Sequence, residues 1–256
     1  MELNLGGKFA IVTGASRGLG AALCQGLAKE GVHLLLNYVS NTAKAESVAE
    51  NLRQAYGVRV ELFQADVTDE AQVEAMFAHA EAVFHRHPHI LVNNAGICPV
   101  VDVVDMDYAD WKRVMDINFN SAFLTCRTFA RRCIAAKTGG RIVNVASQAA
   151  FNGSKRGKTH YASSKGAMVS FTISFAKEVA RHGIFVNAVL PGMLDTDLTR
   201  ETLEIPGEKE KYGAAITLGR IGELAEVATM VAFLASEQAS YSTGGMFDIT
   251  GGMLSR

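Results

Sequence analysis

The sequence is poor in the residues that mark unusual architectures. Its 256 residues include four cysteines, four prolines and one tryptophan, and no two cysteines share a C-x-x-C spacing. This small number and spacing of cysteines exclude a disulfide scaffold and a cysteine-based metal knuckle. We therefore expect the thiols of Cys24, Cys98, Cys126 and Cys133 to be reduced and inert. A hydrophobic content of 48% excludes a disordered or collagen-like chain.

Long apolar runs are also missing. The longest stretch without Asp, Glu, Lys or Arg runs from His87 to Val101, which is 15 residues with two prolines. A membrane span needs about 18–20 apolar residues, so we expect none. The first eight residues do not form a basic region followed by an apolar run, which predicts the absence of a secretory signal and a cytoplasmic location.

No excess of either charge is present. The 25 Lys and Arg balance 26 Asp and Glu, for a net charge of −1, so no strong field attracts nucleic acid or an anionic membrane. Histidines at 85, 87 and 89 surround Pro88, but without carboxylates at ligand spacing we expect no metal. The expected partner is a small or carrier-bound molecule.

What the sequence does contain is an alternation of short apolar runs and longer helical stretches. Expected strands are Phe9–Val12, Val32–Leu36, Arg59–Phe63, Ile90–Val92, Ile142–Val145, Phe185–Val189 and Met246–Ile249. Expected helices are Gly20–Glu30, Thr42–Tyr56, Glu70–Phe84, Tyr108–Ala136, Tyr161–His182 and Glu223–Ala235. This alternation predicts an α/β protein, a single Rossmann-type domain over residues 1–256 with about seven parallel strands and helices on both faces. The charged segment 195–213 breaks the rhythm and is expected to be a surface excursion that serves as a substrate lid.

A glycine-rich loop follows the first expected strand. It reads Thr13-Gly14-Ala15-Ser16-Arg17-Gly18-Leu19-Gly20 and leads into a helix. In this context backbone N–H groups and a helix N-terminus can hold a pyrophosphate. Gly14 allows a tight turn, Gly18 lets the backbone approach the phosphates, and Gly20 lets the helix pack closely. A purely structural turn remains an alternative.

The end of the second expected strand bears on the choice of dinucleotide. An acidic residue there would accept hydrogen bonds from a ribose 2′-OH, but residues 33–41 contain neither Asp nor Glu. Arg17 can instead bind a 2′-phosphate, and Asn37, Ser40 and Asn41 can add hydrogen bonds. We therefore expect NADP(H) in preference to NAD(H). The alternative is that Arg17 is merely solvated at a helix start.

A tyrosine and a lysine are spaced to share one face of a helix. Tyr161 and Lys165 lie four residues apart at the start of a helical stretch. A nearby ammonium lowers the pKa of a phenol, which is about 10 in water, toward the range useful for acid and base chemistry. A surface helix pair is the alternative interpretation of this spacing taken alone.

Taken together, these motifs make the sequence resemble the short-chain dehydrogenase/reductase family over nearly the whole chain. The resemblance rests on the glycine loop, Asn93–Gly96, Ser147, the Tyr161 and Lys165 pair, and the segment Pro191–Thr196, which occur in the family's order. It implies that Tyr161 is the acid or base, Lys165 lowers its pKa and binds the nicotinamide ribose, and Ser147 orients the carbonyl. It also implies that Asn118 holds the water of a proton relay.

The same resemblance implies further cofactor contacts. Asp66 and Val67 match the pair that cradles adenine. Asn94, Ala95 and Gly96 match the turn beneath the adenosine ribose. Leu194 and Thr196 match positions that hold the nicotinamide amide. Family members commonly form homotetramers through the two long helices, here Tyr108–Ala136 and Tyr161–His182.

The expected activity is reduction of a 3-oxoacyl-type carbonyl with NADPH, or the reverse oxidation, as in reductases of acyl-carrier substrates. Two alternatives remain, an NAD-linked polyol or sugar dehydrogenase and a non-catalytic nucleotide sensor on the same fold. The basic insert 152–158 either is a solvated loop or meets a phosphorylated or carrier-bound substrate. His160, beside Tyr161, is expected to face water.

Overall fold

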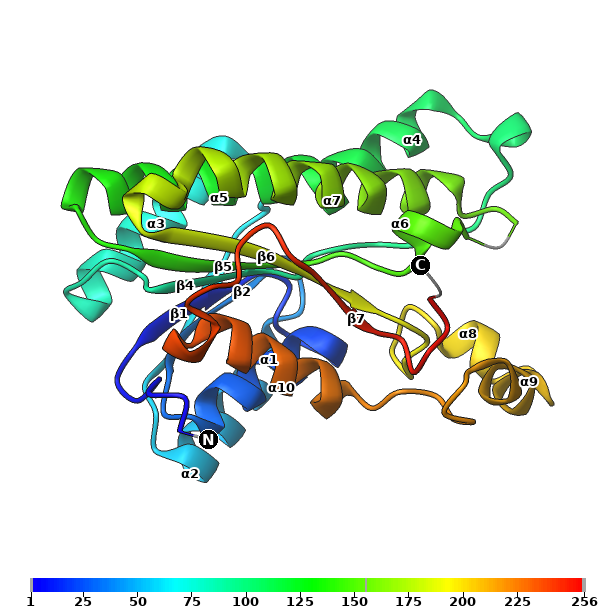
Figure 1. Ribbon diagram of the computed structural model, residues 1–256, viewed down its shortest axis with the longest axis horizontal. Helices are drawn as coiled ribbons and strands as arrows, with labels where there is room; N and C mark the ends of the chain where they lie inside the picture. Colours follow the sequence, from blue (N-terminus) through cyan, green and yellow to red (C-terminus); the bar gives the residue numbers. More distant parts are fainter. Residues whose placement is uncertain (1, 155, 255–256) are drawn as a thin grey trace.

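The computed structural model describes residues 2–154 and 156–254, without the side chain of Glu201 (Figure 1). Within these residues seven strands form one parallel sheet in the order β3-β2-β1-β4-β5-β6-β7. The strands are β1 (Phe9–Val12), β2 (His33–Tyr38), β3 (Val60–Gln64), β4 (Ile90–Asn93), β5 (Gly140–Val145), β6 (Ile184–Pro191) and β7 (Met246–Ile249). The predicted doubly wound fold is confirmed, and β5 and β6 are longer than predicted.

Helices cover both faces of the sheet (Figure 1). On one face lie α1 (Gly18–Lys29), α2 (Thr42–Tyr56) and α10 (Leu224–Ala235). On the other lie α3 (Glu70–Phe84), α4 (Tyr108–Met115), α5 (Ser121–Ala136), α6 (Ala149–Asn152) and α7 (Thr159–Val179). The predicted single helix over 108–136 is interrupted by a π-helical turn, Asp116–Asn120, between α4 and α5. No helix in the described part of the chain is long and apolar enough to cross a membrane.

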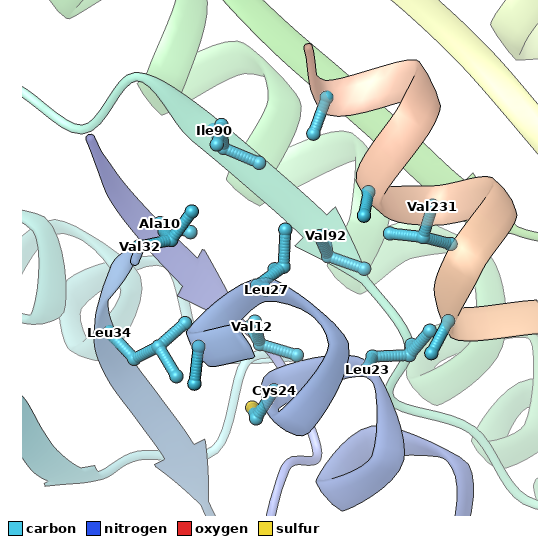
Figure 2. Close-up of a cluster of buried hydrophobic side chains, with 14 of the residues drawn as sticks. Ala10, Val12, Leu23, Cys24, Leu27, Val32, Leu34, Ile90, Val92 and Val231 are labelled. Carbon is cyan, nitrogen blue, oxygen red and sulfur yellow. The ribbon is translucent and has the colours of Figure 1, made fainter. Parts of the chain in front are cut away.

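Strand β1 shows why both faces are apolar. Successive side chains of a strand point to opposite faces. Phe9 and Ile11 join the core beneath α3, α5 and α7, whereas Ala10 and Val12 join the core beneath α1 and α10. Figure 2 shows side chains of α1 and α10 meeting the strand residues in this second core. Burial on both faces agrees with the position of β1 inside the sheet, between β2 and β4, and the glycine loop follows its carboxyl end.

The N-termini of the helices differ in whether a side chain caps their free backbone N–H groups. Asn41 caps α2 by accepting a hydrogen bond from the Lys44 N–H, and Asp69 caps α3 through the N–H groups of Ala71 and Gln72. Helix α1 has no side-chain cap and no acidic residue in its first turn. The N-terminus of α1 therefore keeps its positive dipole end and free backbone donors for an anion.

The lid segment, defined as residues 195–213, is more ordered in secondary structure than predicted. It contains α8 (Arg200–Leu203) and most of α9 (Glu208–Ala215). Leu203 and Tyr212 are buried and anchor the two helices. In Figure 1 both helices lie at the end of the sheet where β6 terminates, the same end as α4 and α6. This end of a parallel sheet is the one at which α/β proteins bind ligands.

Candidate active site

The glycine loop packs closely against the turn that follows β4. Gly14 has φ +62°, and a Cβ there would lie 2.9 Å from the Cα of Ala95. A Cβ on Gly20 would lie 2.2 Å from the carbonyl oxygen of Gly14. Both glycines are therefore required for the loop's shape, because neither contact leaves room for a side chain.

Thr13 and Asn94 hold these two turns together. The Thr13 hydroxyl accepts hydrogen bonds from the backbone N–H groups of Asn94, at 3.0 Å, and Ala95, at 3.1 Å. The Asn94 amide donates to the carbonyls of Thr13 and Gly14, at 3.0 and 3.1 Å. Thr13 was not among the predicted site residues, although a threonine directly after a buried strand can hydrogen-bond to a neighbouring turn.

The structure corrects the prediction for Asn37. Its side chain is fully buried. The amide oxygen accepts from the Gly14 N–H at 3.3 Å, and the amide nitrogen donates to the carbonyls of Phe63 and Ala65, at 3.4 and 2.9 Å. Asn37 thus shapes the loop from below, and a direct hydrogen bond to a 2′-phosphate does not fit its position. Ser40 is exposed at the end of β2.

Of the remaining residues assigned to a dinucleotide by sequence, Thr196 faces this loop, and Asp66 and Val67 follow β3. A Cβ on Gly18 would lie 4.0 Å from the Cβ of Thr196, so the segment after β6 faces the loop. Val67 is buried, while Asp66 is exposed and accepts two hydrogen bonds from Thr68. The close-packed glycines and the uncapped start of α1 fit a pyrophosphate.

Arg17 has a partner that the sequence did not predict. Its Nε lies 3.2 Å from an oxygen of Asp197, in the lid segment, and the Arg17 side chain is 59% exposed. The other Asp197 oxygen lies 2.8 Å from a terminal nitrogen of Arg200. The glycine loop and the lid segment are therefore joined by an ion pair.

Ser147, Tyr161 and Lys165 come together between β5 and α7. Ser147 is buried just beyond β5, and its hydroxyl accepts a hydrogen bond from the Ala149 N–H at 3.1 Å. A hydrogen bond between Ser147 and Tyr161 lowers the pKa of the phenol. Lys165 is 3% exposed and lies one helical turn from Tyr161, with Nζ 5.8 Å from the centre of the ring. The structure thus brings the three predicted catalytic side chains into one cluster.

The electrostatics of this cluster differ from the sequence prediction. Burial raises the pKa of Tyr161 to about 12, against the opposing effect of Ser147. Burial also lowers the pKa of Lys165 to about 8. In the protein alone, desolvation therefore outweighs the predicted effect of the ammonium on the phenol. At neutral pH the phenol holds its proton and the ammonium is mostly charged.

Asn118 occupies the π-helical turn and is fully buried. Its amide oxygen accepts from the Ile97 N–H at 2.8 Å, and its amide nitrogen donates to the Ile97 carbonyl at 2.9 Å and to the Ser164 hydroxyl at 3.0 Å. The Ser164 hydroxyl donates to the Tyr161 carbonyl. Asn118 thus connects the loop after β4 to the first turns of α7. Single π-helical turns are rare in proteins, and many of those observed lie at functional sites.

A buried polar chain supports the cluster from inside the sheet. Asn93 accepts from the Thr125 hydroxyl at 2.6 Å and donates to Asn144 at 2.9 Å, and Asn144 donates to the Thr172 hydroxyl at 2.9 Å. These bonds join α5, β4, β5 and α7. The pairing of Asn93 with Asn144 was not predictable from the sequence, because the two residues lie 51 positions apart.

The surroundings of Tyr161 correct one further expectation. His160 is fully buried, not facing water, and burial lowers its pKa. In the basic insert, Arg156 forms an ion pair with Asp102, and the Gly157 carbonyl accepts from the Val101 N–H at 2.8 Å. Arg156 thus fastens the insert to the loop after β4. Lys155 lies outside the described residues.

The four cysteine thiols are unpaired with one another and lie wholly or partly inside the protein. Cys24, Cys126 and Cys133 are buried and Cys98 is half-buried, and all four are free. Burial raises the pKa of every one of them. Among the described residues no group of three His, Cys, Asp or Glu side chains is placed to hold a metal ion.

An open hollow of about 760 Å³ lies between Asp195, Lys209 and the start of α10, beside the lid segment.

Comparison with known proteins gives matches that cover nearly the whole chain. A family model described as enoyl-(acyl carrier protein) reductase matches residues 14–254. The 3-oxoacyl-[acyl-carrier-protein] reductase FabG of Aquifex aeolicus is 37% identical over 255 residues, covering 99% of this chain and 100% of its own. The (3R)-3-hydroxyacyl-CoA dehydrogenase of Rattus norvegicus is 34% identical, with 98% of each chain covered. A crystal structure of a short-chain type dehydrogenase/reductase from Mycobacterium marinum superposes with a TM-score of 0.92 at 31% identity, covering 100% of this chain and 98% of that one.

Proposed function

Because the chain belongs to the short-chain dehydrogenase/reductase family of nicotinamide-dependent oxidoreductases, we propose that it reduces a 3-oxoacyl-type carbonyl with NADPH. The bound nicotinamide would supply the hydride. The chain's own residues would bind the carbonyl oxygen, stabilise the charge that develops there and protonate it. Two relatives are named for related chemistry, one for reducing 3-oxoacyl groups on a carrier protein and one for 3-hydroxyacyl-CoA dehydrogenation.

The observation that carries this proposal is the cluster of Ser147, Tyr161 and Lys165. Ser147 and Tyr161 share a hydrogen bond, so both hydroxyls can reach one substrate oxygen. Because burial raises the pKa of Tyr161 to about 12, its phenol is protonated at neutral pH, the form that a reduction consumes. Asn118, through Ile97 and Ser164, positions the segments around this phenol.

The proposed preference for NADP(H) is supported by charge at the nucleotide end of the site. Arg17 lies in the glycine loop and is exposed, and no carboxylate follows β2 before α2 begins. A guanidinium can bind a 2′-phosphate bidentately, and such charge-assisted bonds contribute about 1.5–3 kcal/mol each. Ser40, exposed after β2, is proposed as a further hydrogen-bond donor.

The remaining nucleotide contacts are proposed from the placement of residues around the loop. Backbone donors of residues 16–20 would hold the pyrophosphate. Asp66 and Val67 would border the adenine, and Asn94, Ala95 and Gly96 would border the ribose. Leu194 and Thr196 would meet the nicotinamide amide, and Thr196 lies opposite Gly18.

A comparison of two cofactors and two substrate classes tests the proposal. Initial rates are measured with an acetoacetyl thioester and with a polyol or sugar, each with NADP(H) and NAD(H). We expect turnover of the thioester with NADPH, and we expect Arg17→Ala to lose about 10- to 100-fold in kcat/KM for NADPH while keeping its rate with NADH. Turnover of the polyol with NAD, and none of the thioester, would contradict the proposal.

We also propose that the chain forms a homotetramer through α5 and α7. Phe123 on α5 and Ile173 on α7 are large apolar side chains that are 39% and 37% exposed, and Phe123 stacks edge-on against Phe171. Large apolar side chains that remain partly exposed on helices can be buried when copies of a chain associate. Light scattering is expected to give four times the chain mass for the wild type and a smaller species for Phe123→Asp combined with Ile173→Asp.

A further inference from the structure

The ion pair between Arg17 and Asp197 joins the glycine loop to the lid segment. The Arg17 Nε lies 3.2 Å from one oxygen of Asp197, and a terminal nitrogen of Arg200 lies 2.8 Å from the other. Each carboxylate oxygen therefore faces a different guanidinium. Arg17 precedes α1, whereas Asp197 and Arg200 belong to the lid segment.

The turn that carries Asp197 is held in place by its own hydrogen bonds. The Thr199 hydroxyl accepts from the Thr196 N–H at 3.0 Å and donates to the Leu194 carbonyl. Leu194 pairs with Gly222 in an isolated parallel bridge. Asp197 is thus presented to Arg17 by a defined turn where the lid segment leaves β6.

A phosphate and this carboxylate would compete for the same guanidinium. A phosphate monoester carries about −1.5 to −2 charges at pH 7 and a carboxylate carries one, so the phosphate is the stronger partner for Arg17. Release of Arg17 does not leave Asp197 without a partner, because Arg200 remains. The ion pair is 59% exposed on the Arg17 side and 31% on the Asp197 side, so its own strength amounts to about fivefold in an equilibrium constant or less.

We propose that Asp197 is a specificity-determining residue whose carboxylate competes with a 2′-phosphate for Arg17, so that binding of the phosphate releases the lid segment from the glycine loop. The inference rests on the proposed use of NADP(H). The contact between the lid segment and the glycine loop would then depend on whether the bound nucleotide carries a 2′-phosphate.

Binding of nucleotide fragments tests this without turnover. Dissociation constants of adenosine 2′,5′-bisphosphate and adenosine 5′-monophosphate are measured by calorimetry for the wild type and three variants. We expect Asp197→Asn to bind the bisphosphate about two- to fivefold more tightly and the monophosphate unchanged. In Arg200→Ala the Asp197 carboxylate has Arg17 as its remaining partner and competes more strongly with the phosphate. We therefore expect this variant to bind the bisphosphate more weakly than the wild type.

Asp195→Asn is the matched control. It removes the same charge two residues away, from a pair with Lys209 at 3.3 Å, and we expect both dissociation constants to stay as in the wild type. Hydrogen exchange supplies a second readout: the bisphosphate should speed exchange of backbone amides in residues 196–203, and the monophosphate should not.

Two outcomes would overturn the inference, and they differ in what else they affect. If the wild type prefers the bisphosphate but Asp197→Asn binds it equally or more weakly, Asp197 is not a competitor and the cofactor proposal stands. If the wild type itself shows no preference for the bisphosphate, the proposed use of NADP(H) is wrong and the inference goes with it.

Discussion

Lys165 and Tyr161 lie one turn apart on α7, but the hydrogen bond of the lysine runs to the sheet. Its Nζ donates to the carbonyl oxygen of Val145, at the end of β5, at 2.7 Å, and lies 5.8 Å from the centre of the Tyr161 ring. The strand therefore fixes the ammonium beside the phenol without using the phenol as its partner. This leaves the Tyr161 hydroxyl to Ser147 and to a substrate.

The pKa of Lys165 predicts an alkaline limit to activity. Burial lowers this pKa from its ordinary value of 10.5 to about 8, so the amine is charged below pH 8 and loses its charge as the pH rises through that value. The quantity kcat/KM for the dinucleotide reports groups of the free enzyme, and we expect it to fall above about pH 8. The pH profile of Lys165→Met should lack this limb. A wild-type profile that stays flat to pH 9.5 would contradict the assignment.

Asn118 is expected to matter for both stability and rate. Asn118→Leu leaves the Ile97 N–H and carbonyl without their partner, and unpaired buried groups cost about 1–3 kcal/mol each. We expect the free energy of unfolding to fall by about 2–4 kcal/mol, measured by urea denaturation, together with a lower kcat.

Asn120→Ala provides the control for this substitution. Asn120 lies in the same π-helical turn but is exposed and bonds only its neighbour Asp116 among the described hydrogen bonds. We expect its unfolding free energy and kcat to remain close to the wild type. Equal losses in the two variants would mean that the turn, and not the Asn118 amide, is what the site needs.

Substitution of Gly20 tests whether the close packing of the glycine loop supports nucleotide binding. The methyl group of Gly20→Ala would lie 2.2 Å from the Gly14 carbonyl oxygen, so the loop must shift. We expect nucleotide affinity to fall at least about tenfold, as a shift of the phosphate donors loses charge-assisted hydrogen bonds. Gly6→Ala, where no atom lies within 4 Å of the new Cβ, should bind as the wild type does. Unchanged affinity in Gly20→Ala, measured by calorimetry, would show that this packing does not support the nucleotide site.

Much of the fold was predictable because its signals are local. The helical spacing of residues within Thr42–Tyr56 and Glu70–Phe84 predicted α2 and α3 with the bounds that the structure has, since this signal acts within a few residues. The π-helical turn around Asn118 was missed because apolar periodicity does not distinguish it from the α-helices on either side. The two short helices of the lid segment lacked enough length for a periodic signal.

The site was predictable in its residue types but not in its pairings. Motif order placed Ser147, Tyr161 and Lys165 together, as the structure does. The burial of Asn37 and His160 and the ion pair of Arg17 with Asp197 depend on contacts between distant segments. The pKa of Tyr161 was predicted in the wrong direction for the protein alone, because the sequence displays the nearby ammonium but not the desolvation that opposes it.

The measurement that tests the central claim most directly is single-turnover reduction of an acetoacetyl thioester by Tyr161→Phe preloaded with NADPH. The substitution removes only the hydroxyl that would protonate the substrate oxygen, and we expect the rate to fall about 10²- to 10⁴-fold while the calorimetric affinity for NADPH is retained. A rate equal to that of the wild type, with the same affinity, would contradict the account.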